Sequence, residues 1–270
     1  MIEKDSEWIL PENLKKQQKK SRELIDEGKG NTNHGGDFGS YYAYRKGINF
    51  DYIKHHVLSN DLRGFKYVKN LQAFLNRKGF SFKGEILYVG CAIGTITNAI
   101  NQLSEGGITY GIDISNDGIA VAKQKYPNCI FYCQSADDLS NFNNGQFDII
   151  HCKEFYPFTR TNDKEYHMKY LKLFYEKLKR HGFVVLEMVS LNKGFCNTYY
   201  ELKGPLKKVG FLFVSKDIFL PHKIFSVFGA FSYKSPIYKF TKLITRIIAA
   251  FYKVFHISGR ISYCYILAKK

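Results

Sequence analysis

The stretch from Gly84 to Thr97, GEILYVGCAIGTIT, constrains the fold of this 270-residue chain more than any other. It opens with an apolar run, residues 86–89, that is typical of a strand buried on both faces of a parallel sheet. A turn of glycine and other small residues follows, and a helical pattern comes after it. The sequence therefore predicts a strand, a tight turn that lets a ligand approach the backbone, and a helix.

A second apolar strand, residues 108–112, ends in Asp113, about 20 residues after the glycine turn. A carboxylate at the tip of the neighbouring strand can accept hydrogen bonds from a ribose diol. The glycine loop lacks the GxGxxG spacing of a pyrophosphate binder and the Lys-Ser/Thr of a phosphate-binding P-loop. We therefore expect a nucleoside ligand without a phosphate chain.

These residues resemble the class I S-adenosylmethionine-dependent methyltransferases. The first strand of that family typically reads Leu-Asp-Val-Gly-Cys-Gly-x-Gly, and residues 87–94 of this chain read LYVGCAIG. Further matches follow in the family's order: YGIDIS (110–115), SADDL (135–139), QFDIIHC (146–152) and LKRHGFVVLE (178–187). The resemblance implies a doubly wound, Rossmann-like α/β fold whose sheet is mostly parallel with one antiparallel strand, and S-adenosyl-L-methionine as the cofactor.

The resemblance also implies cofactor-binding roles for residues at the ends of the strands: Tyr88, Gly90, Cys91, Ala92, Gly94, Asp113, Ile114, Ala136, Asp137 and His151. Two positions depart from the family pattern. Tyr88 replaces an acidic residue that helps to hold the methionine ammonium, and Ala92 replaces a glycine, which costs little if its φ is negative. As an alternative, Asp137 could cap the start of a helix.

The fourth strand is followed by the segment HCKEFYPF, residues 151–158. Because the carboxyl ends of parallel strands form the ligand crevice, we expect this segment to face the transferred methyl group. A base there would remove the proton of the acceptor, and the candidate catalytic residues are His151, Glu154 and His34. His151 could instead be a buried histidine, and Glu154 an ion-pair partner of a nearby cation. The segment lacks the Asn/Asp-Pro-Pro-aromatic signature of certain amino-group methyltransferases, which favours an oxygen acceptor.

The residues before the core predict a solvated helix over 11–28, a loop over 29–44 and one or two amphipathic helices over 50–80. In the resembling enzymes, the segment before the core closes over the cofactor and lines the substrate site. The candidate substrate residues are Tyr41, Tyr42, Tyr44 and Tyr156. We divide the chain into an N-terminal lid extension (1–64), the methyltransferase core (65–220), a helical insert (221–260) and a final strand (261–270).

The net charge of +16 is unevenly distributed. Residues 85–150 hold two lysines and seven acidic residues, whereas residues 221–270 hold nine lysines and arginines and no acidic residue. In the insert, apolar side chains recur at helical spacing from Phe240 to Phe255, and Lys239, Lys242, Arg246 and Lys253 share the opposite side. Such a helix can lie on an anionic membrane, or it can pack its apolar face on the sheet or on a second subunit, which is the commoner outcome.

The first functional hypothesis is an S-adenosylmethionine-dependent O-methyltransferase acting on a small molecule or a sugar or lipid-linked glycan intermediate, as in polysaccharide biosynthesis. An RNA methyltransferase is the second, and a catalytically silent protein of this fold that binds a membrane or a partner is the third. Six cysteines without a CxxC pair suggest a reducing compartment and no metal site. Since no secretion signal or long apolar span is evident, we expect a cytoplasmic protein, with peripheral contact at the inner membrane surface through residues 236–256 as an option.

Overall fold

The computed structural model describes residues 50–189, 194–219, 236–254 and 262–269. The helix expected over 11–28 and the loop expected over 29–44 lie outside these ranges. The same applies to four of the candidate site residues, namely His34, Tyr41, Tyr42 and Tyr44.

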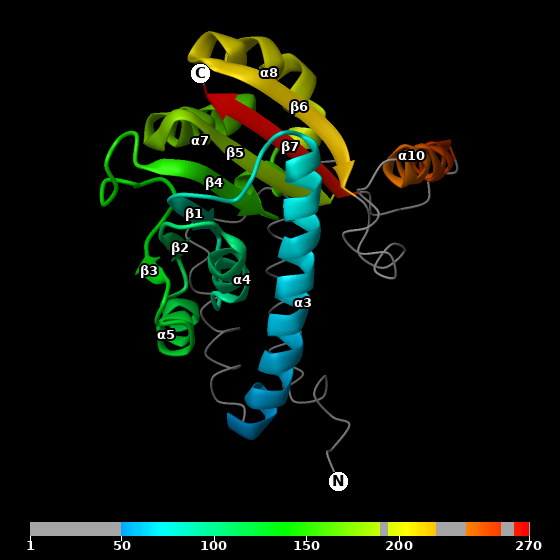
Figure 1. Ribbon diagram of the computed structural model, residues 1–270. Coiled ribbons are helices and arrows are strands. Elements are labelled where there is room, and N and C mark those ends of the chain that lie inside the picture. The colour runs from blue at the N-terminus through cyan, green and yellow to red at the C-terminus, as the bar shows by residue number, and fades with distance from the viewer. Residues whose placement is uncertain (1–49, 190–193, 220–235, 255–261, 270) are drawn as a thin grey trace, which may run out of the picture.

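The described residues form a seven-stranded sheet with the order β3-β2-β1-β4-β5-β7-β6 (Figure 1). The strands are β1 (Ile86–Val89), β2 (Thr109–Asp113), β3 (Ile130–Cys133), β4 (Phe147–Lys153), β5 (Leu178–Val189), β6 (Phe211–Phe219) and β7 (Ser262–Lys269). Only β7 runs antiparallel to its neighbours, β5 and β6. This confirms the predicted doubly wound α/β fold with one antiparallel strand in a mostly parallel sheet.

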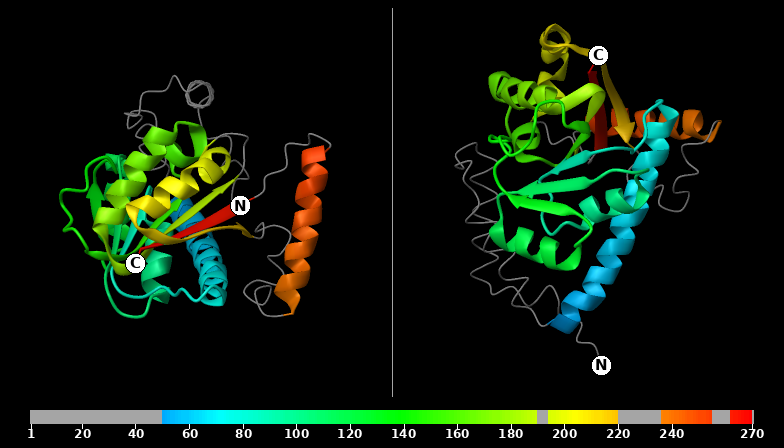
Figure 2. Two further views of the ribbon diagram at one scale, coloured as in Figure 1. Left: turned by 90° about the horizontal axis from the view of Figure 1, so that it is seen from above. Right: turned by 60° about the vertical axis from the view of Figure 1, so that its left-hand side comes forward.

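Helices cover both faces of the sheet (Figures 1 and 2). The helices on one face are α3 (Phe50–Arg77), α4 (Thr95–Leu103) and α5 (Asn116–Lys125), and those on the other are α6 (Tyr156–Arg160), α7 (Lys164–Lys177) and α8 (Phe195–Val209). Two hydrophobic clusters result, because side chains alternate across each strand. In β1, for example, Leu87 and Val89 join the cluster under α7 and α8, whereas Ile86 and Tyr88 join the one under α3.

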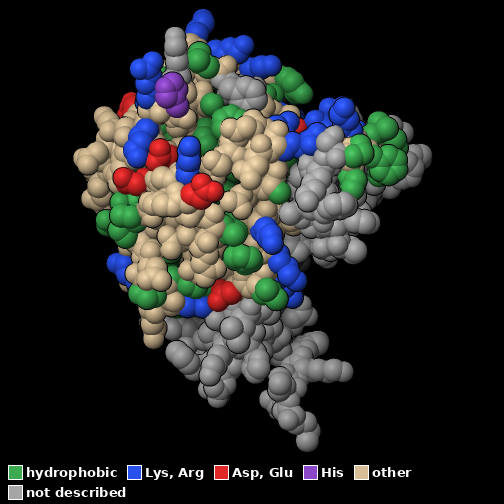
Figure 3. Space-filling model, viewed as in Figure 1, with side chains coloured by type: hydrophobic (Ala, Val, Ile, Leu, Met, Phe, Trp, Pro, Cys, Tyr) green, Lys and Arg blue, Asp and Glu red, His purple; other side chains and the backbone are tan. Residues whose placement is uncertain are grey.

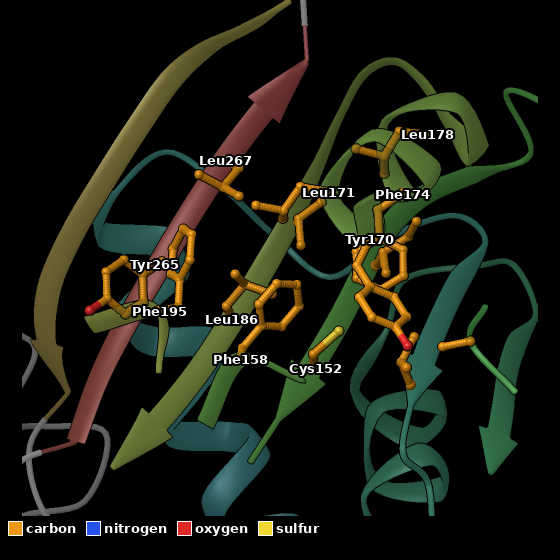
Figure 4. Packing of buried hydrophobic residues seen from close by; sticks show 14 of the residues in the cluster. Cys152, Phe158, Tyr170, Leu171, Phe174, Leu178, Leu186, Phe195, Tyr265 and Leu267 are labelled. Atoms are coloured by element: carbon orange, nitrogen blue, oxygen red, sulfur yellow. The ribbon is translucent and has the colours of Figure 1, made fainter. Parts of the chain in front are cut away.

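The cluster under α7 and α8 is rich in aromatic residues (Figure 4). Phe158 approaches Tyr170 and Phe174 edge to face, those two rings are tilted against each other, and Phe158 lies beside Leu186 of β5. Because this packing fixes α6 and α7 on the sheet, it also fixes the residues that lead from β4 into α6.

One predicted boundary differs from the structure. A single helix, α3, crosses the expected domain boundary between residues 64 and 65, so the residues on either side belong to one element. Helix α8 continues through Pro205. Proline removes the hydrogen bond to the carbonyl of Glu201, but that residue is exposed, so water can replace the missing partner.

The last described helix, α10 (Ile237–Val254), follows β6 and contacts it at the edge of the sheet (Figure 2, left). No helix within the described ranges is long and apolar enough to cross a membrane.

Candidate active site

The turn after β1 exposes backbone rather than side chains. The N–H groups of Gly90 and Cys91 both donate to the carbonyl of Ile112, each at 2.9 Å, which ties the turn to β2. Gly90 has a φ of 78°, in the left-handed region that glycine tolerates best. The nearest atom to a β-carbon added at Gly90 would be in Phe155, 3.9 Å away, so the space beside this backbone is open.

Asp113, at the tip of β2, holds this turn in place. One carboxylate oxygen accepts a 2.8 Å hydrogen bond from the N–H of Ala92, and the other accepts a 2.9 Å hydrogen bond from the N–H of Ser115. Burial raises the pKa of Asp113, although hydrogen bonds from Ser115, Ala92 and Ile114 oppose this rise. The carboxylate keeps acceptor capacity for a hydrogen bond from a ligand beyond these three.

A cavity of about 260 Å³ opens at the carboxyl ends of β1, β2, β3 and β4. Its walls are Val89, Gly90, Ala92, Ile112, Asp113, Ile114, Gln134, Ser135, Ala136, Asp137, Lys153, Glu154, Phe155, Pro157, Tyr166 and Tyr170. This volume is close to the lower limit of about 300 Å³ that is usual for small-molecule sites.

Seven of the predicted site residues line this cavity: Gly90, Ala92, Asp113, Ile114, Ala136, Asp137 and Glu154. Ala92 has a φ of 50°, so the condition of a negative φ is not met, and alanine here adopts the strained conformation that suits a glycine. Asp137 lies in a turn and caps no helix; its carboxylate is 2.6 Å from Nζ of Lys169. Partial burial would raise the pKa of Asp137, but hydrogen bonds from Lys169, Tyr170 and Ser135 lower it.

Four predicted residues do not line the cavity: Tyr88, Cys91, Gly94 and His151. Tyr88 is buried in the cluster under α3, so it supplies no polar group at the place of the family's acidic residue. Gly94 caps α4, and a β-carbon there would collide with Phe131 and Ala122, so it serves helix packing. Tyr156 begins α6, but its side chain lies outside the described residues.

His151 is fully buried, which corrects the prediction that it faces a ligand or acts as a base in the crevice. Its Nε2 lies 2.6 Å from Oε1 of Glu187, and its ring meets Tyr88 edge to face. No hydrogen-bond partner for Nδ1 is found in the described part of the chain. The position of His151 therefore fits the alternative interpretation, a buried histidine, better than the role of a base in the crevice.

Glu187 is the centre of this buried group. The hydroxyl of Tyr67, from α3, donates to the same Glu187 oxygen that His151 contacts. Burial alone would raise the pKa of Glu187, but the hydrogen bond and charge of His151, the charge of Lys153 and the Tyr67 hydroxyl lower it below its usual value. Three polar side chains from α3 and β4 therefore support one buried carboxylate on β5.

Lys153 links this buried group to the cavity. Its Nζ lies 3.4 Å from the centre of the Tyr67 ring, and its side chain lines the cavity beside Glu154. Burial lowers the pKa of Lys153, although the charges of Glu187 and Glu154 oppose this. Glu154 has a φ of 51°, and its N–H donates to the carbonyl of Glu187 at 2.8 Å, so the chain turns sharply here from β4 into α6.

Comparison with known proteins addresses the central part of the chain. Residues 86–182 match the family model described as a methyltransferase domain. A putative methyltransferase, 235L, of Invertebrate iridescent virus 6 is 32% identical over 87 residues, which are 32% of this chain and 31% of the viral protein.

Solved structures match this chain at low sequence identity. A phosphoethanolamine N-methyltransferase of Haemonchus contortus, in complex with S-adenosyl-L-methionine, has a TM-score of 0.47 and 16% identity over 75% of this chain and 52% of its own. An Archaeoglobus fulgidus protein described as a SAM-dependent methyltransferase has a TM-score of 0.47 and 19% identity over 80% of this chain and 99% of its own. The alignments thus span about a third of the viral relative and half of the Haemonchus protein.

All of the residues that line the cavity fall within the matched segment, residues 86–182, and some of them are absent from the candidate set of the sequence analysis. Lys153, Phe155 and Pro157 are three of them, and their place directly after a buried parallel strand was the signal that could have identified them. Tyr166 and Tyr170 of α7 also line the cavity, with their hydroxyls 3.2 Å apart. Their spacing of four residues predicts a shared helix face but not which cavity that face meets.

Proposed function

We propose that this protein is an S-adenosylmethionine-dependent methyltransferase that transfers the methyl group to an oxygen of a small molecule or of a sugar or glycan intermediate. The observation that carries the proposal is the meeting of Gly90 and Asp113 in one cavity inside a methyltransferase domain. A bare backbone at one strand tip and a carboxylate at the next suit the adenosyl part of the cofactor.

The residues around the cavity fit this cofactor. A side chain at Gly90 would point into the open space that an adenosyl group needs, and Asp113 keeps acceptor lone pairs for ribose hydroxyls. Ala136 and Asp137 line the wall at the end of β3, where the resemblance assigns the adenine. When bound, S-adenosylmethionine supplies a methyl group on a positively charged sulfonium that leaves readily.

Side chains from the β4 end would serve the acceptor. Glu154, which lines the cavity, is the base that we propose for removing the proton of an acceptor hydroxyl. Lys153 beside it can donate a hydrogen bond to the acceptor or hold an anionic group on it. Phe155, Tyr166 and Tyr170 offer aromatic surface on which a sugar ring can pack, and the apolar wall excludes water during transfer.

Calorimetric titration with S-adenosylhomocysteine tests the proposal. The wild-type protein should bind, and Asp113→Ala should weaken binding by about 1.5–3 kcal/mol, tenfold or more, because a charged hydrogen-bond acceptor is lost. Asp138→Ala is the matched control, since Asp138 lies in the next loop, accepts a 2.9 Å hydrogen bond from the N–H of Ser140 and does not line the cavity.

Thermal melting of both variants separates lost binding from lost folding, because Asp113 also holds the N–H groups of Ala92 and Ser115. Absence of binding by a folded wild-type protein would contradict the enzymatic proposal and favour a catalytically silent protein of this fold. If the wild-type protein binds S-adenosylhomocysteine and also retains RNA on a filter in a salt-sensitive way, RNA would replace the small molecule as the proposed methyl acceptor.

A further inference from the structure

Helix α10 is attached to the sheet through its polar side. The buried carboxylate of Asp217, on β6, accepts a 3.1 Å hydrogen bond from the hydroxyl of Tyr238 and lies 2.9 Å from Nζ of Lys242. Lys78, at the end of α3, reaches the same carboxylate at 2.5 Å. Burial alone would raise the pKa of Asp217, but Lys78 and Lys242 lower it, so this anchor stays charged. Tyr238 and Lys242 are four residues apart and therefore face the protein together.

The opposite side of α10 is an exposed apolar stripe made of Phe240, Leu243 and Ile247, which are 64%, 56% and 60% exposed. Other large exposed apolar side chains of the described residues occur singly on other elements, but these three are spaced by three and four residues and form one surface. Figure 3 shows apolar side chains gathered on the outer end of the molecule, over α10. The expectation that this face packs on the sheet is wrong for these three residues.

Positive charge borders the stripe. Lys239 and Arg246 are exposed and lie seven residues apart, so they fall on the same flank of the helix. No acidic residue occurs in α10 or anywhere in residues 221–270. A second copy of this chain, with a net charge of +16, would bring like charges together at this surface. An anionic surface complements both the apolar stripe and its basic flank.

The position of Asp217 in the sheet also shows where α10 is attached relative to the cavity. In the register of the sheet, Lys153 of β4 lies opposite Glu187 of β5, Glu187 lies opposite Cys264 of β7, and Cys264 lies opposite Asp217 of β6. These residues occupy one row across the sheet, so Asp217 is three strands from Lys153, about 14 Å at the usual strand spacing. The helix is therefore attached at the level of the sheet from which the cavity opens.

We propose that α10 docks this protein on an anionic membrane surface. The helix lies flat, Phe240, Leu243 and Ile247 enter the headgroup region, and Lys239 and Arg246 contact lipid phosphates. The Asp217 anchor carries the rest of the protein to the membrane, with the cavity at the same end of the sheet. This docking does not depend on methyl transfer.

Flotation of the full chain with vesicles tests the proposal. We expect binding to an equal mixture of phosphatidylcholine and phosphatidylglycerol and none to phosphatidylcholine alone. The double variant Leu243→Ser/Ile247→Ser should bind the anionic vesicles more than tenfold more weakly, because it loses the apolar area that is buried in the membrane. Lys239→Gln and Arg246→Gln should each weaken it about fivefold.

Leu212→Ser is the matched control, since Leu212 is 59% exposed but lies at the start of β6, away from α10. It should leave flotation unchanged, and thermal melting should report a folded protein for every variant. Failure of the wild type to float with anionic vesicles, or undiminished flotation of the Leu243/Ile247 variant, would overturn the proposal. A wild-type dimer that becomes a monomer in the same variant would overturn it too, because a second copy would then cover this face.

Discussion

At the ends of β1 and β2 the cavity wall consists mainly of backbone, whereas at the end of β4 it consists of side chains. On the first side, Gly90 leaves open space. Each carboxylate oxygen of Asp113 there accepts a hydrogen bond from a backbone N–H, that of Ala92 or that of Ser115. On the second side, Lys153 and Glu154 enter the cavity, supported from behind by Glu187 and Tyr67.

This difference allows one part of the cavity wall to bind the proposed cofactor and another part to select the methyl acceptor. The backbone side depends on residues within one strand-helix-strand unit, so a short sequence pattern can specify it. The side-chain side takes residues from α3, β4, β5 and α7, which are far apart in the chain. We therefore expect substitutions on the two sides to have separable effects, which the following predictions test in order of decreasing effect.

The largest effect is expected for Glu187→Ala. It leaves His151, Tyr67 and Lys153 without the carboxylate that they share, and removing one partner of a buried charged group costs about 3–5 kcal/mol of the free energy of unfolding. Urea unfolding measures this loss. Glu201→Ala, which breaks only the exposed pair with Lys164, should cost less than about 1 kcal/mol.

If the two sides are separable, folded Glu187→Ala protein should keep its affinity for S-adenosylhomocysteine. A parallel loss of affinity and stability would show that the buried group supports the whole cavity, and the proposed division would then fail.

A glycine pair tests the backbone side. Gly90 and Gly79 have similar φ values, 78° and 83°, but only Gly90 lines the cavity. Alanine in this conformation costs about 1 kcal/mol, so both variants should lose a similar amount of stability in urea unfolding. Gly90→Ala should in addition bind S-adenosylhomocysteine at least tenfold more weakly, as its methyl group enters the cavity. Equal affinities of the two variants would argue against a ligand at Gly90.

The smallest effect concerns His167, which supports the side-chain half from behind. Its Nε2 donates to the carbonyl of Pro157 at 2.8 Å, and its Nδ1 lies 2.8 Å from the hydroxyl of Thr198. Burial lowers the pKa of His167 below the usual 6.5, although the Pro157 carbonyl and the charge of Asp163 oppose this. As the pH falls through 6.5, the unfolded chain therefore binds a proton that the folded protein does not.

The contribution of His167 to stability is thus complete above pH 6.5 and is lost as the pH falls toward its folded pKa, with a slope of at most about 1.4 kcal/mol per pH unit. Urea unfolding at about pH 8 and about pH 5.5 should show a steeper loss for the wild type than for His167→Gln. Identical slopes would rule out this contribution.

The sequence by itself determined the order and type of the elements. The strands expected at residues 108–112 and 146–152 occur as β2 and β4 within one residue at either end, since apolar runs and glycine turns are local signals. The same local pattern placed Gly90 and Asp113 at neighbouring strand tips, and both line the cavity.

Only the tertiary structure decided where the other side chains point. Tyr88 and His151 are paired in register on β1 and β4, but both are buried away from the cavity, because His151 meets the Tyr88 ring and the carboxylate of Glu187, to which Tyr67 of α3 donates. The sequence likewise predicted an amphipathic α10, whereas Asp217 on a distant strand determined which side faces outward. A periodic pattern specifies the faces of an element, but contacts between residues far apart in the chain specify what each face meets.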